Sequence, residues 1–599
     1  MPRLRPLALR RLVALAVVII GAIVFSVRLI DVQIVSAAQL NADALDKRGV
    51  PVSIPSVRGD IVDRNGVVLA TTDERYDVQL SPRVARLNGG KFWREVTLPD
   101  GGIDTVQVTA EQAFGEIGAI TGQSAEEIAT IVDEALAENP KSDFAYVKRA
   151  VDLTTLNALK QLDIGWLTFD INHQRLSPTG AVGGNIVGFS GADGEPQAGI
   201  ALSQQECLTG VDGEESYEKG ADGVRLPGSV VVTKEAQNGG TIQLTLDIDL
   251  QYEAQQIINA QTSAAAAEWG LLTIMDAETG ELVAVAEDYS VDPNDVSASD
   301  ADRREARSFT WPYEPGSTYK AFTAAMLVDQ GAANAATQHW TSYQASPEEG
   351  VYYSDAFVHE DMPWTLAGIL VESSNVGITA LGARVPEHTR YEYMQRLGLG
   401  EATDVGMPAE SAGLLYDVAD WDRQTSYATM FGQGLSSTIV QTASAYQAIA
   451  NDGVRIPPSL VMGCTSPDGE VTEYERGEPV QVFSADTAAQ TREMIEAVAN
   501  EAWIADQLAI PGYRIGGKTG TAEQSDGEGG YRTDYVYTFA GMFPLEDPKY
   551  VAVATIAYPK AMHGTVAATR TWNAAAEATI RTFHLPPSSG AYQPLPLTY

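Results

Sequence analysis

The distribution of apolar and charged residues separates a short membrane-type segment from a long remainder. Residues 12–27 form a run without any charge, and the run continues past Arg28 as far as Ile30. A helix over residues 12–30 measures about 28 Å, which is enough to cross the hydrocarbon core of a bilayer when Arg28 reaches outward to the interface. We therefore predict a transmembrane helix at residues 12–30.

The charges beside this run predict its orientation. Residues 1–11 hold four arginines and no acidic residue. Basic flanks stay on the cytoplasmic side, so residues 1–11 are expected to be a cytoplasmic tail and the bulk of the chain to be extracytoplasmic. A cleaved signal peptide is the alternative, because Ser36-Ala37-Ala38 resembles a small-residue cleavage site. That site lies far beyond the apolar run, so a retained anchor is the preferred interpretation.

The next segment, residues 31–235, has the pattern of a mixed α+β domain. Asn65-Gly66 between apolar β-formers predicts a hairpin with a type I′ turn, and residues 75–81 continue as a strand. Ser124 opens a Ser-x-x-Glu capping box ahead of an amphipathic helix, and Asp152 is expected to cap a second helix. No catalytic constellation occurs in this segment.

The composition changes after Gly239-Gly240. The predicted elements are a strand at 241–246, a helix at 249–265, a hairpin from 271–275 and 281–286, helices between 317 and 450, and strands at 513–522 and 535–557. This order predicts an α/β domain at residues 236–585, with helices packed on an antiparallel sheet. A Pro-rich tail at 586–599 is expected to lie over the surface or to be disordered.

Composition excludes several classes of function. The chain has 599 residues, of which 44% are hydrophobic, so it holds more than one globular domain. Its net charge of −39 argues against a nucleic-acid partner. The six histidines lack metal-ligand spacing, so neither a metal nor another cofactor is predicted. Cys207 and Cys464 have no Cys-x-x-Cys spacing; a disulfide is one alternative, and two separate buried thiols are the commoner outcome.

A candidate nucleophile lies at the start of a predicted helix. Pro315 and Gly316 interrupt the preceding element, and Ser317 then precedes an Ala-rich apolar run. Lys320 follows one helical turn later. A buried amine at this place would lose its proton near neutral pH and could deprotonate the serine. An isolated Ser-x-x-Lys is usually a helix cap beside a solvated lysine, so this pair needs support from other motifs.

Two later stretches supply that support. Ser373-Ser374-Asn375 follows a helical pattern and places a hydroxyl two residues from an amide. Gly516 to Ala522 encloses Lys518-Thr519-Gly520-Thr521 between glycines, which suits a strand edge that a substrate backbone approaches closely. Each stretch is weak alone. Ser-x-x-Lys, Ser-x-Asn and Lys-Thr-Gly in this order form a known catalytic set, and three chance matches are improbable.

With these motifs the chain resembles a class B penicillin-binding protein, and more narrowly the FtsI-type division transpeptidase of actinobacteria. The hairpin at 58–70 resembles the start of that family's non-catalytic pedestal, and residues 432–453 resemble its helical region before Lys-Thr-Gly. One departure is Ala201, where relatives usually have glutamate; it lies in the pedestal, so it bears on domain coupling and not on chemistry. The resemblance implies a pedestal at 31–235 and a transpeptidase domain at 236–585.

The resemblance also implies the role of each motif residue in cross-linking peptidoglycan stem peptides. Ser317 would be the nucleophile, Lys320 the general base, and Ser373 a relay that carries a proton to the leaving D-alanine. The residues implied to bind substrate are Asn375, Lys518, Thr519, Gly520 and Thr521. The backbone N–H groups of Ser317 and Thr521 would form the oxyanion hole.

The implied partners are D-Ala-D-Ala stem peptides with an amine acceptor, penicillin and other β-lactams that trap Ser317, and a membrane glycan polymerase of the FtsW type with other divisome proteins. The implied location is the membrane at the division septum. Three alternatives stay open: an elongation-type transpeptidase, a β-lactamase, and a non-catalytic β-lactam sensor or scaffold. A β-lactamase is less expected, because it has no evident use for an anchor and a pedestal.

Overall fold

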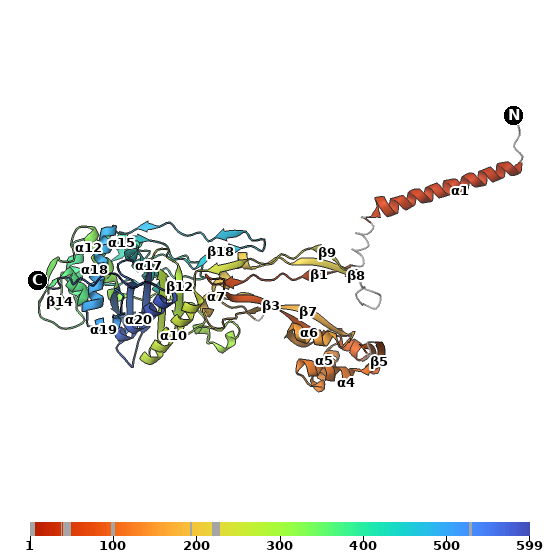
Figure 1. Cartoon of the computed structure of the whole chain (residues 1–599), viewed down its shortest axis with the longest axis horizontal. Coiled ribbons are helices and arrows are strands. Elements are labelled where there is room, and N and C mark those ends of the chain that lie inside the picture. The colour runs from red at the N-terminus through yellow and green to blue at the C-terminus, as the bar shows by residue number, and fades with distance from the viewer. Residues whose placement is uncertain are drawn as a thin grey trace, which may run out of the picture. The chain divides into compact units, whose positions relative to one another are not determined.

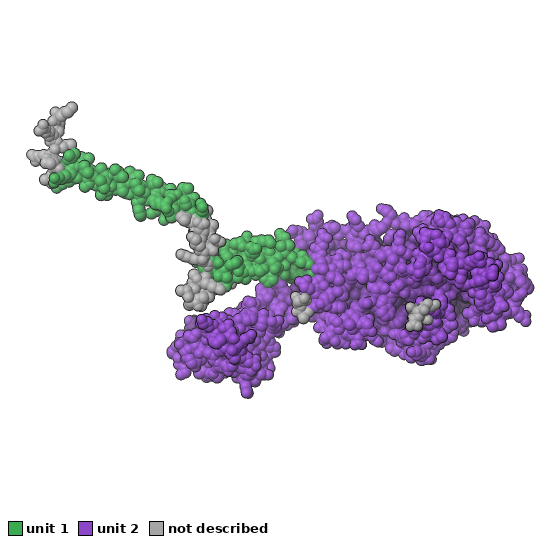
Figure 2. Space-filling model, turned by 180° about the vertical axis from the view of Figure 1, so that it is seen from behind, with its two compact units in different colours: residues 1–58, 209–239 green, residues 59–208, 240–599 purple. Residues whose placement is uncertain are grey.

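The computed structural model describes residues 6–37, 39, 49–97, 102–191, 194–218, 228–525 and 530–599. The chain forms two compact units, coloured separately in Figure 2. Unit 1 comprises residues 1–58 and 209–239, and unit 2 comprises residues 59–208 and 240–599. The pedestal at 31–235 and the catalytic domain at 236–585 are predicted from motifs and resemblance and not from compactness, and their boundaries stay a prediction.

Unit 1 contains the predicted membrane segment and a small sheet. Helix α1 (Pro6–Ile30) continues into the π-helical turn η1 (Asp31–Val35). Among the described residues, the stretch Leu9–Val35 is the one helix long and apolar enough to cross a membrane. Residues 1–5 of the expected cytoplasmic tail, and Ala38 of the cleavage-like site, lie outside the described residues. The sheet is antiparallel in the order β1-β8-β9, with bounds Gly49–Ile54, Gly213–Glu218 and Val231–Lys234.

The first sheet of unit 2 joins early and late segments of the chain. It has seven strands, six of them in the order β19-β18-β10-β2-β3-β6, and β7 also pairs with β3. The bounds are β2 Ile61–Val62, β3 Val68–Leu80, β6 Ala145–Val151, β7 Leu167–Leu176, β10 Thr241–Leu244, β18 Val461–Thr465 and β19 Val471–Glu473. Strands β2 and β10 pair in parallel, and Ile61 lies opposite Ile242.

The β2–β3 hairpin forms as predicted, but its turn is not type I′. A type I′ turn requires positive φ at both central residues. Gly66 has φ +83°, whereas Asn65 has no positive φ. The side chain of Asp63 organises the turn instead, because its Oδ1 accepts the backbone N–H groups of Asn65 and Val67, both at 2.8 Å. The prediction failed because a hydrogen-bonding aspartate competes with the intrinsic preference of Asn-Gly.

A helical lobe packs against β3 and β6. Its elements are α3 (Pro82–Ala85), η2 (Leu87–Gly89), β4 (Lys91–Thr97), β5 (Ile103–Thr109), α4 (Ala110–Thr121), α5 (Ala125–Glu138) and α6 (Leu153–Lys160). The predicted capping box of Ser124 and cap of Asp152 are both present, with N–H···O distances of 3.2 Å and 2.7 Å. Phe114, Ile128 and Trp166 are buried at its centre.

The second sheet of unit 2 is the predicted antiparallel sheet covered by helices (Figure 1). Its order is β12-β11-β23-β22-β21, with bounds Leu282–Glu287, Trp269–Asp276, Tyr550–Ala557, Val536–Phe543 and Gly516–Ala522. Alternate residues of the central strands point to opposite faces. One face packs on α10 (Ile248–Ala265) and α20 (Gly564–Thr582), and the other on α17 (Ile439–Ala450). The sheet is therefore buried on both sides, and β21 is an edge strand.

Unit 2 contains further elements. They are α7 Gly184–Val187, α8 Gly199–Ser203, α9 Gln205–Leu208, η3 Val296–Ala298, η4 Ala301–Arg303, α11 Arg307–Thr310, η5 Gly316–Tyr319, α12 Lys320–Asp329, β13 Gln338–Thr341, β14 Gln344–Ala345, β15 Tyr353–Ser354, β16 Met362–Thr365, α13 Leu366–Val371, α14 Asn375–Gly382, α15 Glu387–Arg396, η6 Val418–Asp420, α16 Arg423–Ala428, η7 Thr429–Phe431, β17 Val454–Arg455, β20 Val480–Gln481, α18 Ala485–Glu501 and α19 Ala505–Leu508.

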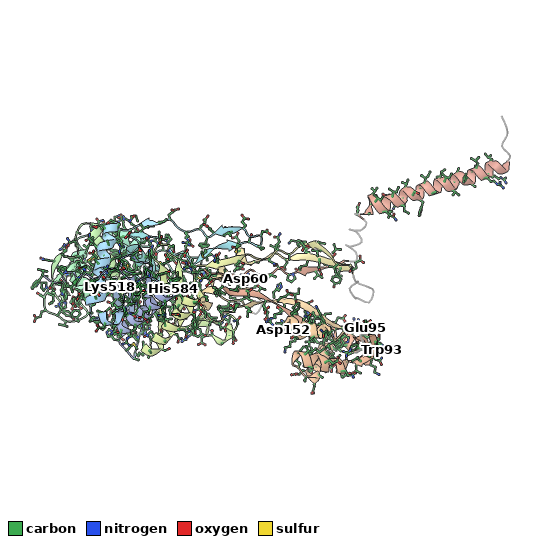
Figure 3. All side chains as sticks on the ribbon, viewed as in Figure 1. Asp60, Trp93, Glu95, Asp152, Lys518 and His584 are labelled. Atoms are coloured by element: carbon green, nitrogen blue, oxygen red, sulfur yellow. A yellow bond between two sulfur atoms is a disulfide. The ribbon has the colours of Figure 1, made fainter. Side chains whose placement is uncertain are left out.

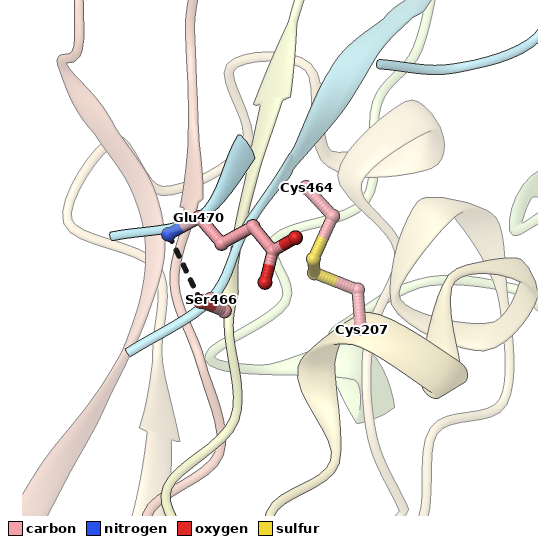
Figure 4. Close-up of a disulfide and its surroundings, with 4 residues drawn as sticks. All are labelled: Cys207, Cys464, Ser466 and Glu470. Carbon is pink, nitrogen blue, oxygen red and sulfur yellow. Dashed lines mark hydrogen bonds between the residues drawn. A yellow bond between two sulfur atoms is a disulfide. The ribbon is translucent and has the colours of Figure 1, made fainter. Parts of the chain in front are cut away.

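One long-range bond, a disulfide, differs from the outcome that the sequence favours. Cys207 of α9 and Cys464 of β18 form a disulfide, so the expectation of two separate thiols is wrong (Figure 4). The parallel β2–β10 pairing brings α9 alongside the sheet, and sequence spacing cannot reveal such proximity.

The tail after Pro586 lies on the surface of unit 2, where Ser588 N donates to the Gly512 carbonyl at 2.9 Å.

Candidate active site

The candidate nucleophile Ser317 lies in a tight turn, η5, immediately before α12. Gly316 and Thr318 on either side of it are buried, whereas Ser317 stays partly exposed. Two hydrogen bonds hold the turn: Thr318 Oγ1 donates to the Pro315 carbonyl at 3.0 Å, and Tyr446 Oη donates to the Thr318 carbonyl at 2.8 Å. The turn therefore presents the Ser317 hydroxyl on a rigid support.

Strand β21 lies directly against this turn, because glycines remove the side chains that would separate them. Gly316 has φ +57°, and a Cβ added there would lie 2.7 Å from the Thr521 carbonyl oxygen. A Cβ added at Gly520 would lie 2.5 Å from the Pro315 carbonyl oxygen. Both distances are shorter than ordinary contacts. The turn and the strand edge can therefore approach only with glycine at these positions.

Two lysines meet at the hydroxyl of Ser373. Lys320 Nζ donates to the Ser373 carbonyl and, at 3.3 Å, to Ser373 Oγ. Lys518 Nζ, from β21, donates to Ser373 Oγ at 2.9 Å and to Thr519 Oγ1 at 3.1 Å. Both lysines are fully buried, and Figure 3 labels Lys518 inside the helix-covered domain. The structure thus joins three segments that are far apart in the sequence.

Burial controls the charge of these two amines. Removal from water lowers the pKa of Lys320 to about 7, although the carboxylate of Asp355 opposes the shift. Burial, reinforced by repulsion from Lys320, lowers the pKa of Lys518 well below its ordinary value. A neutral amine can accept a proton, and a pKa near the working pH is what general-base catalysis requires.

Ser373 has a backbone conformation that L-residues rarely adopt, with φ +57°. Such a conformation costs about 1–3 kcal/mol and persists only where surrounding contacts enforce it. The next residue, Ser374, is fully buried, and its hydroxyl donates to Asp355 Oδ2 at 2.7 Å. The Asn375 side-chain amide donates to the Ser354 carbonyl at 2.8 Å. The whole motif is thereby pinned to the loop that contains Asp355.

Asp355 is the site residue that sequence reasoning missed. Its carboxylate also accepts the backbone N–H of Val376 at 3.0 Å and contacts His359 Nε2 at 2.9 Å. The Asp355 side chain is 1% exposed, so it is a buried charge supplied with donors from three residues. No spacing pattern marks a lone aspartate in a loop; three-dimensional contacts alone identify it.

His359 is the titratable partner of Asp355. Its Nδ1 lies 2.6 Å from the Glu360 carbonyl and its Nε2 lies 2.9 Å from the carboxylate of Asp355. Both partners are acceptors, and only the imidazolium has two N–H donors. Burial works against the charged ring, but the Glu360 carbonyl and the Asp355 carboxylate outweigh it and raise the pKa of His359.

Glu314 is a second titratable group beside the nucleophile turn. Burial raises the pKa of its carboxyl to about 7, against the effect of the Gly434 N–H. Its backbone is clamped by Gln524, which accepts from the Glu314 N–H at 3.0 Å and donates to the Glu314 carbonyl at 3.1 Å. Glu314 therefore links the nucleophile turn to the segment after β21, and its charge changes near neutral pH.

The remaining predicted site residues lie along the edge strand. Thr519 is half-buried and Thr521 is exposed, and these two threonines with Gly520 extend away from Lys518 toward the turn of Ser317. Among the strands that the structure describes, edge strand β21 pairs with β22 on one side and with none on the other. The arrangement offers a nucleophile, two amines with lowered pKa values and a strand edge suited to an extended peptide.

Known proteins resemble both the sequence and the fold. The transpeptidase domain family of penicillin-binding proteins matches residues 270–576. The penicillin-binding protein PbpB of Mycolicibacterium smegmatis is 36% identical over 569 residues, which cover 90% of this chain and 84% of the relative. The peptidoglycan D,D-transpeptidase FtsI of Escherichia coli is 26% identical over 552 residues, which cover 91% of this chain and 87% of that protein. Penicillin-binding protein 3 of Mycobacterium tuberculosis, complexed with aztreonam, matches with a TM-score of 0.68 at 27% identity over 92% of this chain and 100% of that chain.

Proposed function

The chain belongs to the FtsI-type penicillin-binding proteins and is a peptidoglycan D,D-transpeptidase, and from that premise we propose that it works through an acyl-enzyme on Ser317 at the division septum. The observation that carries the proposal is the meeting of Lys320 and Lys518 at the hydroxyl of Ser373. These groups are the proposed base, the proposed carboxylate-binding lysine and the proposed proton relay, and Lys320 follows Ser317 by three residues.

In the acylation step Ser317 Oγ attacks the carbonyl carbon between the two terminal D-alanines of a stem peptide. The hydroxyl proton passes to the neutral amine of Lys320. The peptide C–N bond breaks, and the terminal D-alanine leaves as an amine after it receives a proton through Ser373. The backbone N–H groups of Ser317 and Thr521 stabilise the oxyanion, at about 3–4 kcal/mol per donor.

In the second step an amine on a neighbouring strand attacks the ester on Ser317. A new amide C–N bond forms as the ester C–O bond to Ser317 breaks, and Ser317 Oγ takes up the proton that the attacking amine gives up. Lys518, Thr519 and Thr521 hold the terminal carboxylate of the donor along the strand edge, where Gly520 permits close approach, and Asn375 holds the peptide backbone. A bound carboxylate would favour the ammonium form of Lys518, whose pKa is lowered by burial and by repulsion from Lys320.

The test of the nucleophile is acylation of the full-length protein by a fluorescent penicillin, a β-lactam that imitates D-Ala-D-Ala. Wild type and the control Ser297→Ala, altered at an exposed serine of η3, should both become labelled, and Ser317→Ala should not. Equal labelling of Ser317→Ala would overturn the proposal. Rapid release of hydrolysed penicillin would instead support the β-lactamase alternative, and labelling without any cross-linking of a D-Ala-D-Ala donor to an amine acceptor would support the sensor alternative.

The proposed location is the outer side of the cell membrane at the septum, with the N-terminus in the cytoplasm. Two observations support it: the one helix of membrane-spanning length among the residues that the structure describes, and the Cys207–Cys464 disulfide, which suits an oxidising compartment. A fluorescent fusion should concentrate at division sites, and depletion should give elongated undivided cells. Lateral-wall localisation would favour the elongation-type alternative. An FtsW-type glycan polymerase is the proposed membrane partner, to be tested by co-purification.

A further inference from the structure

The end of the tail, within residues 591–599, pairs with strand β16 of the small sheet β13–β16. Thr365 N donates to the Leu597 carbonyl at 3.0 Å, and Tyr599 N donates to the Pro363 carbonyl at 3.1 Å. Trp364 and Thr598 lie opposite each other in this antiparallel bridge. Strand β16 is therefore held between β13 on one edge and the tail on the other.

The tail also contacts the first turn of α13, which follows β16 directly. Thr365 caps that helix by accepting the Gly368 N–H at 3.0 Å, and its hydroxyl donates to the Pro596 carbonyl at 2.7 Å. A Cβ added at Gly368 would lie 2.1 Å from the Leu597 carbonyl oxygen, so the tail backbone rests on the helix without an intervening side chain. The side chains of Leu595 and Leu597 pack against the main core.

The opposite end of α13 carries the strained catalytic loop. Ser373 N donates to the Leu370 carbonyl at 3.2 Å, and Ser374 N donates to the Ile369 carbonyl at 3.0 Å. Because α13 has only six residues, a displacement of its first turn also displaces Ser373 at its other end. The positive φ of Ser373 depends on surrounding contacts that prevent relaxation.

A second route leads from the tail to the same loop. Trp364, opposite Thr598 of the tail, is 3% exposed, and its ring centroid lies 4.8 Å from that of His359. His359 contacts Asp355, and Asp355 accepts the hydroxyl of Ser374. The tail therefore contacts α13, which precedes the motif at 373–375. Through Trp364 and His359 it is also linked to the loop of Asp355, which anchors that motif.

We propose that residues 591–599 are a positioning strap for Ser373, which holds its hydroxyl where Lys320 and Lys518 meet. The contacts described for the strap are with β16, α13 and the core, and not with Ser317; Leu595 and Leu597 are positioning residues that act through α13. The inference rests on the proposed function, because it assigns the strap's effect to the proton relay. It predicts that loss of the strap slows acylation while the five-stranded sheet stays intact.

The experiment uses the full-length protein in detergent and compares two tail variants with a matched control. Deletion of 591–599 keeps the upstream anchor of Ser588 on Gly512, and Leu597→Asp removes an inward side chain. The control Gln593→Asp places the same carboxylate on an exposed side chain whose one hydrogen bond stays within the tail. We expect the deletion and Leu597→Asp to slow acylation by fluorescent penicillin about tenfold or more, and the control to stay within about twofold of wild type.

Three further readouts separate positioning from general stability. Hydrogen exchange should rise over residues 366–376 and stay unchanged in β11 and β23. A synthetic peptide of residues 588–599, added to the deletion variant, should restore the acylation rate, and the conservative change Leu597→Met should retain it. If both tail variants are acylated at the wild-type rate, the strap proposal is overturned. It is also overturned if hydrogen exchange rises equally throughout the five-stranded sheet. If the wild-type protein itself is not acylated, the proposed function fails. Hydrogen exchange over residues 366–376 in the tail variants then still tests whether the strap holds this segment in place.

Discussion

Raising the pH from about 6 to about 8 should increase the rate at which penicillin acylates Ser317, because Lys320 acts as a base only after it loses its proton. Burial places the pKa of Lys320 at about 7. The neutral fraction is then roughly one tenth at pH 6 and roughly nine tenths at pH 8, from the ordinary titration relation. The acylation rate should therefore rise about tenfold across this interval, with its midpoint near neutral pH.

The substitution Asp355→Asn should move that midpoint to lower pH. The carboxylate of Asp355 is the charge that stabilises the ammonium form of Lys320, so its removal lowers the pKa of Lys320 further. An interaction of about 1.4 kcal/mol, ordinary for a carboxylate and an ammonium in a protein interior, corresponds to a shift of about one pH unit. The plateau rate should also fall, because Ser374 donates to the same carboxylate.

The assay is rapid-quench labelling of the full chain between about pH 5.5 and about pH 8.5. The assay is best performed in a Glu314→Gln background. The pKa of Glu314 is also raised to about 7, and its titration would otherwise add a second pH dependence to the acylation rate. Lys320→Arg, which stays charged throughout, should lower the rate by at least about 10²-fold and flatten the profile. A pH-independent rate in the parent, or an unmoved midpoint in Asp355→Asn, would refute this account of the base.

Three further predictions follow from contacts away from the base. Replacing both cysteines, Cys207 and Cys464, by alanine should lower the free energy of unfolding by about 2–5 kcal/mol in a denaturant titration, since the disulfide closes a long loop; an unchanged midpoint would contradict this. Gly520→Ala should slow acylation about tenfold or more, because its Cβ would meet the Pro315 carbonyl oxygen at 2.5 Å; a wild-type rate would mean that strand and turn can separate freely. The raised pKa of His359 means that its contribution to stability is complete below about pH 6.5 and is lost as the pH rises through the folded-state pKa. The difference in Tm between wild type and His359→Gln should accordingly shrink as the pH rises, and a constant difference would argue against a charged ring.

Local features of this chain are readable from the sequence because they depend on neighbours a few residues apart. The cap at Ser124 needs only the glutamate three residues later, and the apolar run at 12–30 needs only its own composition. The three motifs are likewise short and ordered, which suffices to indicate the family and the candidate residues. The turn at Asn65-Gly66 shows the limit of this reasoning, since one side-chain carboxylate two residues away changed the turn type.

The tertiary structure alone decides which distant segments meet. Lys518 and Ser373 are 145 residues apart, and their contact depends on the register of β21 against the rest of the sheet. The contacts of Asp355, the Cys207–Cys464 disulfide and the pairing of the tail with β16 leave no local pattern, because each is defined by a partner outside its own sequence neighbourhood. The pKa of Lys320 belongs to the same class. Its sequence neighbours do not set it; burial by packed helices does, and that burial exists only once the chain is folded.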